Sequence, residues 1–396
     1  MEPARELDAI KRWSSRFSGP LRGEAKPHDN DRSPDRRLRI GYVGGRLFGF
    51  HTQSNAFLPV VENRDPEAVD AFCYSDLPEP EEDPITARYR ACSTWRRTGG
   101  LDDAELAALI RADGIDVLID TVGFVESSRL LAAARRPAPV SVMFPPMMSL
   151  GGETVEYLLA DSHILPPEAD ENYAERIERV ALIYRWAPLV PAPDVVLDRP
   201  PGPVVFGSAN NLSKVSSATI ALWAHVLAAV PDSRLLLKAK GFGDPASRRL
   251  YMDRFTAAGI DSARVELRGW TPDLLGHLLI YNEIDVALDT VPYGGVTTTC
   301  EAMWMGVPVI TLVGRRLLGR YGLALLRAVG LDEGIVFSAD EYVARAKALA
   351  DDRNFRRALH SSLRQRMAAS MLCDGASGAL ALEAAYRRMW RRWCES

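Results

Sequence analysis

The sequence contains few cysteines, no long apolar run and almost no excess charge. Its five cysteines are scattered along the chain, and no CxxC pair or Cys/His spacing typical of a metal site occurs. Such cysteine usage favours a reducing compartment. No apolar stretch approaches the roughly 20 residues that span a bilayer, and the charged N-terminus does not resemble a signal peptide. We therefore expect a cytoplasmic protein with no membrane insertion.

The charge balance also argues against one class of partner. The net charge of −4 lacks the basic excess with which proteins follow a nucleic-acid backbone, so we expect no nucleic-acid binding. The 396 residues, 47% hydrophobic and 25% charged, have an ordinary globular composition but are too many for one compact core. Two α/β domains with small appendages are therefore expected.

Alternating strand-like and helix-like segments indicate the fold class. Leu7–Phe17 has the apolar spacing of a helix, and a polar segment separates it from a buried strand at Leu38–Val43. Further strand-like runs at Val69–Ser75, Ile115–Asp120 and Val140–Phe144 alternate with helical patterns. Such alternation predicts a parallel, doubly wound sheet.

A proline-rich segment, Ala187–Pro203, divides the chain. Its six prolines exclude a helix, and a second series of strands and helices follows it. The last third of that series, ending at Ala376–Trp393, is almost entirely helical. The predicted parts are an N-terminal helix and linker (1–36), a first Rossmann-like domain (37–186), the linker (187–203), a second Rossmann-like domain (204–375) and a C-terminal helix (376–396).

Two such domains in tandem predict a cleft between them. Parallel sheets bind ligands at the carboxyl ends of their strands, so a cleft that both sheets face is the expected binding site. This α/β architecture fits a GT-B glycosyltransferase, but it also fits several epimerases and dehydrogenases. The architecture alone therefore does not identify the reaction.

The segment Asp285–Pro308 has the pattern of an anion site. A buried strand is followed by a Pro-Tyr-Gly-Gly turn, and three threonines then open a helix. Free N–H groups at a helix start, with the helix dipole behind them, attract phosphate, and the hydroxyls of Thr297 and Thr298 add donors. Glu301, one turn later, could accept hydrogen bonds from ribose. The structural alternative makes Thr297 a helix N-cap and Glu301 part of a capping box.

A second segment, Val204–Val215, repeats the order of strand, turn and helix start. It places Lys214 after an Asn-Asn-Leu turn at the carboxyl end of a strand. A lysine there could neutralise the charge that develops on a departing nucleoside diphosphate. The alternative is a solvated surface charge, which is the usual role of a single lysine.

These segments make the chain resemble the catalytic region of the O-GlcNAc transferase and SPINDLY family of glycosyltransferases, from about Arg37 to Cys394. The matching strings occur in the order of the family: LRIGYV, RRPAPVSV, FGSANNLSKV, WAHVLAAVPDSRLLLK, EIDVALDTVPYGGVTTTCEAMWMGVPVIT and AYRRMWRRW. The resemblance implies a GT-B fold, with 37–186 on the acceptor side and 204–375 binding the nucleotide sugar. It implies an inverting transfer from a UDP-sugar, N-acetylglucosamine by default, to a Ser or Thr of a protein, without metal or other cofactor.

The resemblance also assigns residues. It implies that Lys214 binds the phosphates and stabilises the leaving group, that Thr297 and Thr298 meet the diphosphate, and that Glu301 meets the ribose. His277 matches a histidine near the uracil. The other donor-site positions are Asn211, Leu212, Tyr293, Gly294 and Gly295.

His51 is the catalytic candidate of the first domain. A single loop histidine is more often structural, although imidazole titrates near neutral pH and could accept a hydroxyl proton. The position of His51 matches the family histidine proposed to lie near the acceptor hydroxyl, which favours a function.

Three loops of the first domain depart from the family pattern. The loop that carries His51, GGRLFGFH, is one residue longer and has Arg46-Leu47 in place of an acidic residue. Gly123-Phe124-Val125 stands where relatives have Gly-His-Thr, and Pro145–Gly152 replaces a glycine- and threonine-rich loop. Proline and methionine remove backbone freedom and add apolar bulk. Three hypotheses therefore remain: a protein O-glycosyltransferase, a glycosyltransferase for a small molecule or secondary metabolite, and a non-catalytic UDP-sugar-binding module.

Overall fold

The computed structural model describes residues 3–23, 25–197, 202–271 and 273–396. The chain forms two compact units. The first runs to Leu189 and is completed by Asp374–Ser396, and the second is Val190–Cys373. The division after Leu189 lies inside the proline-rich segment 187–203, of which residues 198–201 lie outside the described part.

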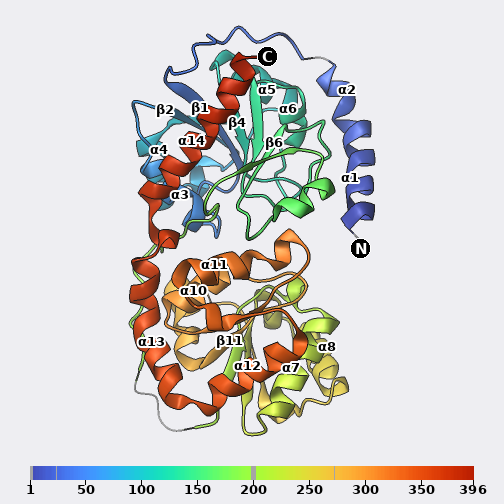
Figure 1. Cartoon of the computed structure of the whole chain (residues 1–396), viewed down its shortest axis with the longest axis vertical. Helices are drawn as coiled ribbons and strands as arrows, with labels where there is room; N and C mark the ends of the chain where they lie inside the picture. The colour runs from blue at the N-terminus through green and yellow to red at the C-terminus, as the bar shows by residue number, and fades with distance from the viewer. Residues whose placement is uncertain (1–2, 24, 198–201, 272) are drawn as a thin grey trace. The chain divides into compact units, whose positions relative to one another are not determined.

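The first unit contains a seven-stranded, entirely parallel sheet within its described residues (Figure 1). The strand order is β3-β2-β1-β4-β5-β6-β7, so the direction of winding reverses between β1 and β4. The strands are β1 (Leu38–Gly45), β2 (Val69–Ser75), β3 (Thr94–Arg97), β4 (Val117–Asp120), β5 (Val140–Met143), β6 (Tyr157–Ala160) and β7 (Arg176–Arg179).

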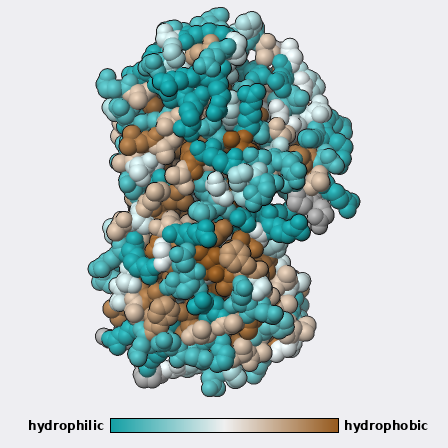
Figure 2. Space-filling view, in the orientation of Figure 1, coloured by the Kyte–Doolittle hydropathy of each residue, from teal (hydrophilic) through white to brown (hydrophobic). Residues whose placement is uncertain are grey.

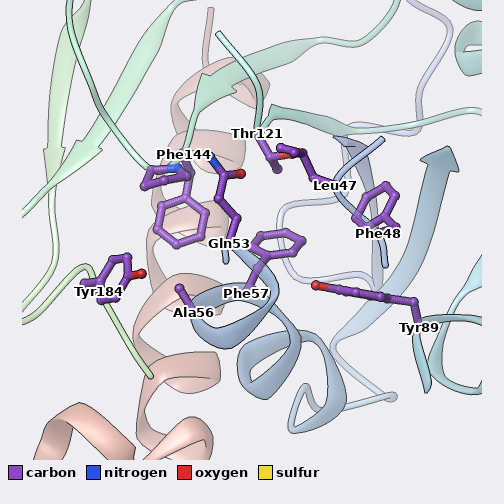
Figure 3. A pocket seen from close by; sticks show the side chains of 10 residues that line it. Leu47, Phe48, Gln53, Ala56, Phe57, Tyr89, Thr121, Phe144 and Tyr184 are labelled. Atoms are coloured by element: carbon purple, nitrogen blue, oxygen red, sulfur yellow. The ribbon is translucent and has the colours of Figure 1, made fainter. Parts of the chain in front are cut away.

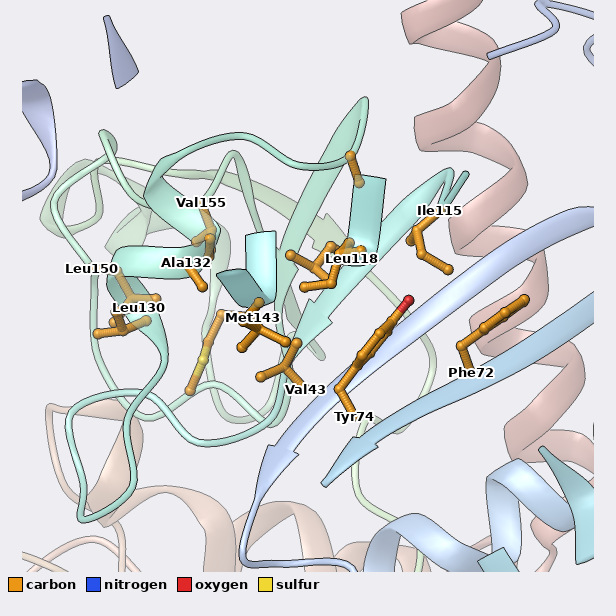
Figure 4. Close-up of a cluster of buried hydrophobic side chains, with 14 of the residues drawn as sticks. Val43, Phe72, Tyr74, Ile115, Leu118, Leu130, Ala132, Met143, Leu150 and Val155 are labelled. Atoms are coloured by element: carbon orange, nitrogen blue, oxygen red, sulfur yellow. The ribbon is translucent and has the colours of Figure 1, made fainter. Parts of the chain in front are cut away.

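Helices cover both faces of this sheet. Helices α5 (Asp103–Ala112) and α6 (Leu130–Ala134) contribute to a buried apolar cluster with strand residues such as Val43, Leu118 and Met143 (Figure 4). Helices α3 (Ser54–Glu62), α4 (Pro84–Cys92) and α14 (Gly375–Cys394) lie on the other face, where Tyr42 of β1 meets Phe57 of α3 at a ring separation of 4.9 Å. The parallel, doubly wound sheet expected from the alternating pattern is confirmed.

Helix α14 belongs to the first unit, although it follows the second series in the sequence (Figure 1). Placing Ala376–Trp393 with the second series is therefore wrong. Its apolar face, which includes Tyr386 and Trp390, is fully buried, and Arg388 and Arg392 both bind the buried carboxylate of Glu178 on β7 at 2.6 Å. These contacts hold α14 on the first unit, although the helix that precedes it in the sequence, α13 (Arg353–Ala368), belongs to the second unit.

The N-terminal helix α1 (Pro3–Phe17) packs against loops of the same unit. Trp13 meets the ring of Phe124 edge to face at 4.7 Å, and the short helix α2 (Gly19–Arg22) follows. Just before α2, the buried hydroxyls of Ser18 and Thr154 are hydrogen-bonded at 2.8 Å. Gly151 lies against Ser14 of α1, because a Cβ atom built on Gly151 would be 2.4 Å from the Ser14 Cβ.

The second unit contains a six-stranded parallel sheet with the order β10-β9-β8-β11-β12-β13. Its winding reverses between β8 and β11. The strands are β8 (Val205–Ser208), β9 (Arg234–Lys238), β10 (Val265–Arg268), β11 (Val286–Leu288), β12 (Val309–Leu312) and β13 (Ile335–Val336). The helices are α7 (Ser217–Ala229), α8 (Pro245–Ala257), α9 (Leu274–Leu279), α10 (Thr297–Trp304), α11 (Tyr321–Val329), α12 (Ala339–Asp351) and α13 (Arg353–Ala368).

The visible surface is mainly hydrophilic, with local hydrophobic areas (Figure 2). Among the described residues, no helix combines the length and the apolar character needed to cross a bilayer. Even α14, which has 20 residues, carries the arginines 387, 388, 391 and 392.

The contact of Gly151 with α1 predicts a stability effect. Gly151 has a φ of +90°, and any side chain there would collide with Ser14. Gly151→Ala should therefore lower the free energy of unfolding by at least about 1–3 kcal/mol. Gly100→Ala is the control, because Gly100 has no positive φ and a Cβ there meets nothing within 4 Å. Equal urea midpoints for the two variants would contradict this account.

Candidate functional site

The candidate site of the second unit lies where the winding of its sheet reverses. The segment that follows β8 carries Asn210 and Lys214, and the segment that follows β11 carries Asp289 and the start of α10. Parallel strands place both segments at the same edge of the sheet. The two sequence motifs, about 80 residues apart, therefore meet in one place.

Lys214 lies against the turn that precedes α10. Its Nζ donates a hydrogen bond of 2.9 Å to the carbonyl of Gly294 and lies 3.9 Å from the centre of the Tyr293 ring. Burial lowers the pKa of Lys214 to about 8, against the opposing attraction of the Asp289 carboxylate. The lysine is thus a half-buried, anchored group, and the alternative of a solvated surface charge is wrong.

A buried carboxylate shapes the Pro-Tyr-Gly-Gly turn. Asp289 Oδ1 accepts the backbone N–H groups of Thr290 (2.9 Å) and Gly295 (2.6 Å), and Oδ2 accepts the Thr311 hydroxyl (2.9 Å). Neither glycine of the turn has a positive φ. A Cβ on Gly294 would be 2.8 Å from Asp289 Oδ2, so glycine is required there for close approach to this carboxylate.

Helix α10 begins without a side-chain cap. Its N-cap residue is Val296, which has no polar side chain, and Thr297 is the first helical residue. The interpretation of Thr297 as the N-cap is therefore wrong. The Thr298 hydroxyl donates to Asn210 Oδ1 at 3.0 Å and so joins the two motifs directly. The N-terminus of α10 combines the positive end of the helix dipole, backbone N–H groups that no side chain caps, and the nearby ammonium of Lys214. This combination suits a diphosphate.

Glu301 belongs to a polar network rather than to a capping box. Its Oε2 accepts hydrogen bonds from the Tyr281 hydroxyl (3.2 Å) and contacts His277 Nε2 (3.0 Å), while His277 Nδ1 lies 2.9 Å from Lys238 Nζ. An ammonium only donates, so His277 Nδ1 must accept and Nε2 carries the proton that binds Glu301. Both ring nitrogens are thereby occupied by protein groups, and Lys238 also donates to Thr271 at 2.7 Å.

Burial perturbs two members of this network. Lys238 is 5% exposed, and burial lowers its pKa, opposed by the nearby Glu301 and Asp273. Burial and then Glu301 raise the pKa of Tyr281, so its hydroxyl stays a donor. The carboxylate of Glu301 has more acceptor positions than these two donors fill, which leaves capacity for a ligand hydroxyl.

The structure brings together Lys214, Tyr293, Gly294, Gly295 and Thr298, as the two motifs indicate. Asn211 is exposed and caps the short helix Leu212–Lys214 through the N–H of Ser213, while the Leu212 carbonyl accepts the Tyr251 hydroxyl. Within the described residues, no three His, Cys, Asp or Glu side chains are grouped as a metal ion would need.

Sequence reasoning missed three polar residues of this edge: Asn210, Asp289 and Lys238. Lys238 is the last residue of β9, Asp289 directly follows β11, and Asn210 is the second residue after β8. The rule that ligands bind at the carboxyl ends of parallel strands could have identified them. Their long-range partners could not have been inferred, since Thr298, Thr311 and His277 lie 88, 22 and 39 residues away in the sequence.

In the first unit, His51 lies in the loop between β1 and α3. Its Nδ1 accepts the backbone N–H of Gln53 at 3.2 Å, which leaves Nε2–H as a donor in the neutral ring. The residue is solvent-exposed, yet desolvation by the surrounding loop lowers its pKa. His51 is therefore a neutral imidazole at pH 7.

Asp120 is a further unusual group in this unit. It ends β4 and is 1% exposed, and its Oδ1 accepts the N–H groups of Val122 (3.1 Å) and Gly123 (2.6 Å). Its Oδ2 has no hydrogen-bond partner among the described residues. Burial raises the pKa of Asp120 to about 6. The carboxylate holds the loop that begins with Gly123 and Phe124.

The altered loop Pro145–Gly152 packs largely inward. Ser149 and Leu150 are buried, and Met147 contacts the apolar cluster of Figure 4. Glu175 accepts the Ser149 hydroxyl at 2.8 Å and the Leu150 N–H at 2.7 Å. Most of this loop is therefore structural, whereas Pro145 at its start lines an apolar pocket of the first unit.

Comparison with known proteins agrees with the geometry. The family model described as glycosyl transferase family 41 matches residues 22–184 and 195–380. Proteins named probable UDP-N-acetylglucosamine–peptide N-acetylglucosaminyltransferase SPINDLY are 35% identical in Petunia hybrida and 33% identical in Arabidopsis thaliana, each over 98% of this chain. The chain spans only 42% and 43% of the length of these two relatives.

Solved structures add to this similarity. A mutant of the O-GlcNAc transferase of Thermobaculum terrenum matches 100% of this chain and 75% of its own, with 38% identity and a TM-score of 0.90. A sucrose-phosphate synthase from Thermosynechococcus elongatus, 14% identical with a TM-score of 0.55, covers 90% of this chain and 100% of its own and shares the fold alone. The expected GT-B type of fold is confirmed by the first of these structures.

The lowered pKa of Lys214 predicts how anion binding depends on pH. The ammonium is present below about pH 8 and is lost above it. Methyl diphosphate is fully ionised above about pH 7, so its affinity should begin to fall between pH 7 and 8, as the ammonium is lost, and should be about tenfold lower by pH 9.5. Calorimetry at several pH values measures this. Lys214→Met should weaken binding and remove the pH dependence, whereas the exposed Lys240→Met should change neither.

Proposed function

Because the chain belongs to glycosyl transferase family 41, we propose that it transfers N-acetylglucosamine from a UDP-sugar to a Ser or Thr hydroxyl of a protein or peptide. The names of its relatives support this choice of donor and acceptor. The observation that carries the proposal is the anchored Lys214 beside the uncapped start of α10. That arrangement suits a diphosphate that leaves as an anion.

The second unit supplies leaving-group stabilisation. As the bond between the anomeric carbon and the β-phosphate oxygen breaks, negative charge grows on the diphosphate, and the ammonium of Lys214 with the backbone amides at the start of α10 neutralises it. Preorganised donors do this at no reorganisation cost. We propose that Glu301 accepts a ribose hydroxyl and that the face of His277 packs near the base, since both its ring nitrogens are already occupied.

The reaction proposed is a single displacement that inverts the anomeric centre. The acceptor oxygen forms a bond to the anomeric carbon, UDP departs with the electron pair, and the hydroxyl proton passes to the imidazole of His51. His51 is the proposed acceptor-side residue. While Nδ1 accepts the backbone N–H of Gln53, the neutral ring carries its proton on Nε2 and can orient the acceptor hydroxyl as a donor. To accept the hydroxyl proton, the ring must first give up the hydrogen bond from Gln53.

The chemistry proposed requires no metal, because Lys214 and the helix start supply the positive potential. A cytoplasmic location forms part of the proposal. The cysteines Cys73, Cys92, Cys300, Cys373 and Cys394 are all free thiols, as expected in a reducing compartment.

The activity has a direct test. Incubation with UDP-N-acetylglucosamine and a library of peptides that contain Ser or Thr should release UDP and add one sugar to some peptides, as measured by mass spectrometry. Release that requires both substrates supports transfer. If UDP binds but no peptide is modified with any UDP-sugar, a non-catalytic UDP-sugar-binding module is the better description.

Lys214 should affect rate more than binding. Lys214→Met removes the charge that stabilises the departing diphosphate, so kcat should fall about 10²–10³-fold, while affinity for UDP-sugar falls less, by about tenfold. Lys240→Met is the matched control and should leave both values unchanged. A loss of affinity with kcat unchanged would assign Lys214 to ground-state binding alone.

A further inference from the structure

A small apolar pocket lies within the first unit, at the point where the winding of its sheet reverses (Figure 3). Leu47, Phe48 and Gln53 reach it from the segment after β1, and Thr121 reaches it from the end of β4. The space inside it that a water-sized group can enter is about 20 Å³, and the volume reaches about 370 Å³ only when its open mouth is included. Its position in this sheet corresponds to that of the diphosphate site in the second unit, so topology makes both of them ligand positions.

The walls of the pocket are rigid aromatic rings. Phe48 and Tyr89 lie 5.0 Å apart, Phe57 and Phe144 lie 5.7 Å apart, and these four side chains are between 1% and 6% exposed. Ala56 and Tyr184 close another side, as Figure 3 shows. Rings that are packed against one another keep their positions, so the pocket is preformed and suits an apolar group.

One polar group at the pocket has no partner. The side-chain amide of Gln53 makes no hydrogen bond to any described residue, and in Figure 3 it lies between Phe144 and Thr121. The Thr121 hydroxyl already donates to the Val43 carbonyl at 3.0 Å and so offers only an acceptor. The side-chain amide can pair with the backbone peptide group of a ligand, and the apolar cavity beside it can hold an apolar side chain. Together they match an amino-acid residue within a peptide.

We propose that this pocket binds an apolar side chain of the acceptor peptide, near the hydroxyl that is glycosylated, while Gln53 pairs with the adjacent peptide group. The inference rests on the proposed function and specifies its substrate class. Gln53 is two residues from His51 and donates its backbone N–H to that ring, so one loop presents both groups. Aspartate or glutamate at the same peptide position is rejected, because the aromatic walls provide no partner for a charge.

Filling the pocket tests the proposal. Ala56→Leu adds three carbon atoms to its wall, and Ala108→Leu makes the same change on the exposed side of α5 as the matched control. The probes are N-acetyl-leucinamide and N-acetyl-glycinamide, whose binding is followed by NMR. The wild type and Ala108→Leu should bind the leucine compound with a Kd of roughly 1–10 mM and at least about tenfold more tightly than the glycine compound.

Ala56→Leu should abolish that difference, and Gln53→Ala should weaken binding of both compounds. Thermal melting identifies a variant that fails to fold, in which case Ala56→Val, with a smaller added volume, replaces it. Equal binding of the two compounds to the wild type, or unchanged binding of the leucine compound to a folded Ala56→Leu variant, would overturn the proposal.

Transfer assays separate this inference from the proposed function. Paired Ser peptides that differ only in a neighbouring Leu or Asp should differ at least about tenfold in kcat/KM with the wild type and less with Ala56→Leu. Sugar transfer without any such preference overturns the pocket assignment and leaves the function standing. Absence of transfer to every peptide overturns the function and, with it, the assignment of the pocket to an acceptor.

Discussion

The buried carboxylate of Asp289 joins the parts of the second unit on which the diphosphate site depends. It accepts backbone N–H groups from Thr290 and Gly295 and a hydroxyl from Thr311, so strand β11, the following turn and strand β12 share one anchor. Its charge also attracts Lys214 and offsets part of the cost of burying that lysine. An isolated buried carboxylate would be strongly unfavourable, and these partners are what make it tolerable.

In each unit, the topology of the parallel sheet determines where a ligand can bind. The carboxyl ends of adjacent strands open outward where the winding reverses, between β8 and β11 in one unit and between β1 and β4 in the other. The proposed diphosphate site occupies the first position with backbone amides and an ammonium. The aromatic pocket occupies the second, and the two positions therefore differ in polarity while sharing a geometry.

Two loops of the first unit that differ from the family pattern have a common neighbour. Phe124 packs on Trp13, and Gly151 lies against Ser14, so both loops contact helix α1. Phe124 thus has an apolar partner on α1, while Met147 of the second loop packs on the apolar cluster of Figure 4. These apolar substitutions have structural partners in the first unit and do not by themselves indicate loss of chemistry.

Local sequence determined the strands β1, β2, β4 and β5, the second series of strands and helices, and the two motifs around Lys214 and Thr297, because periodicity and turn chemistry act over a few residues. It did not predict the shorter strands β3, β6 and β7 of the first sheet. It could not place α14 on the first unit or pair His277 with Lys238, since those outcomes depend on which distant surfaces meet. The same limit applies to the pocket around Phe57. Its rings come from separate segments, and only the folded sheet brings them together.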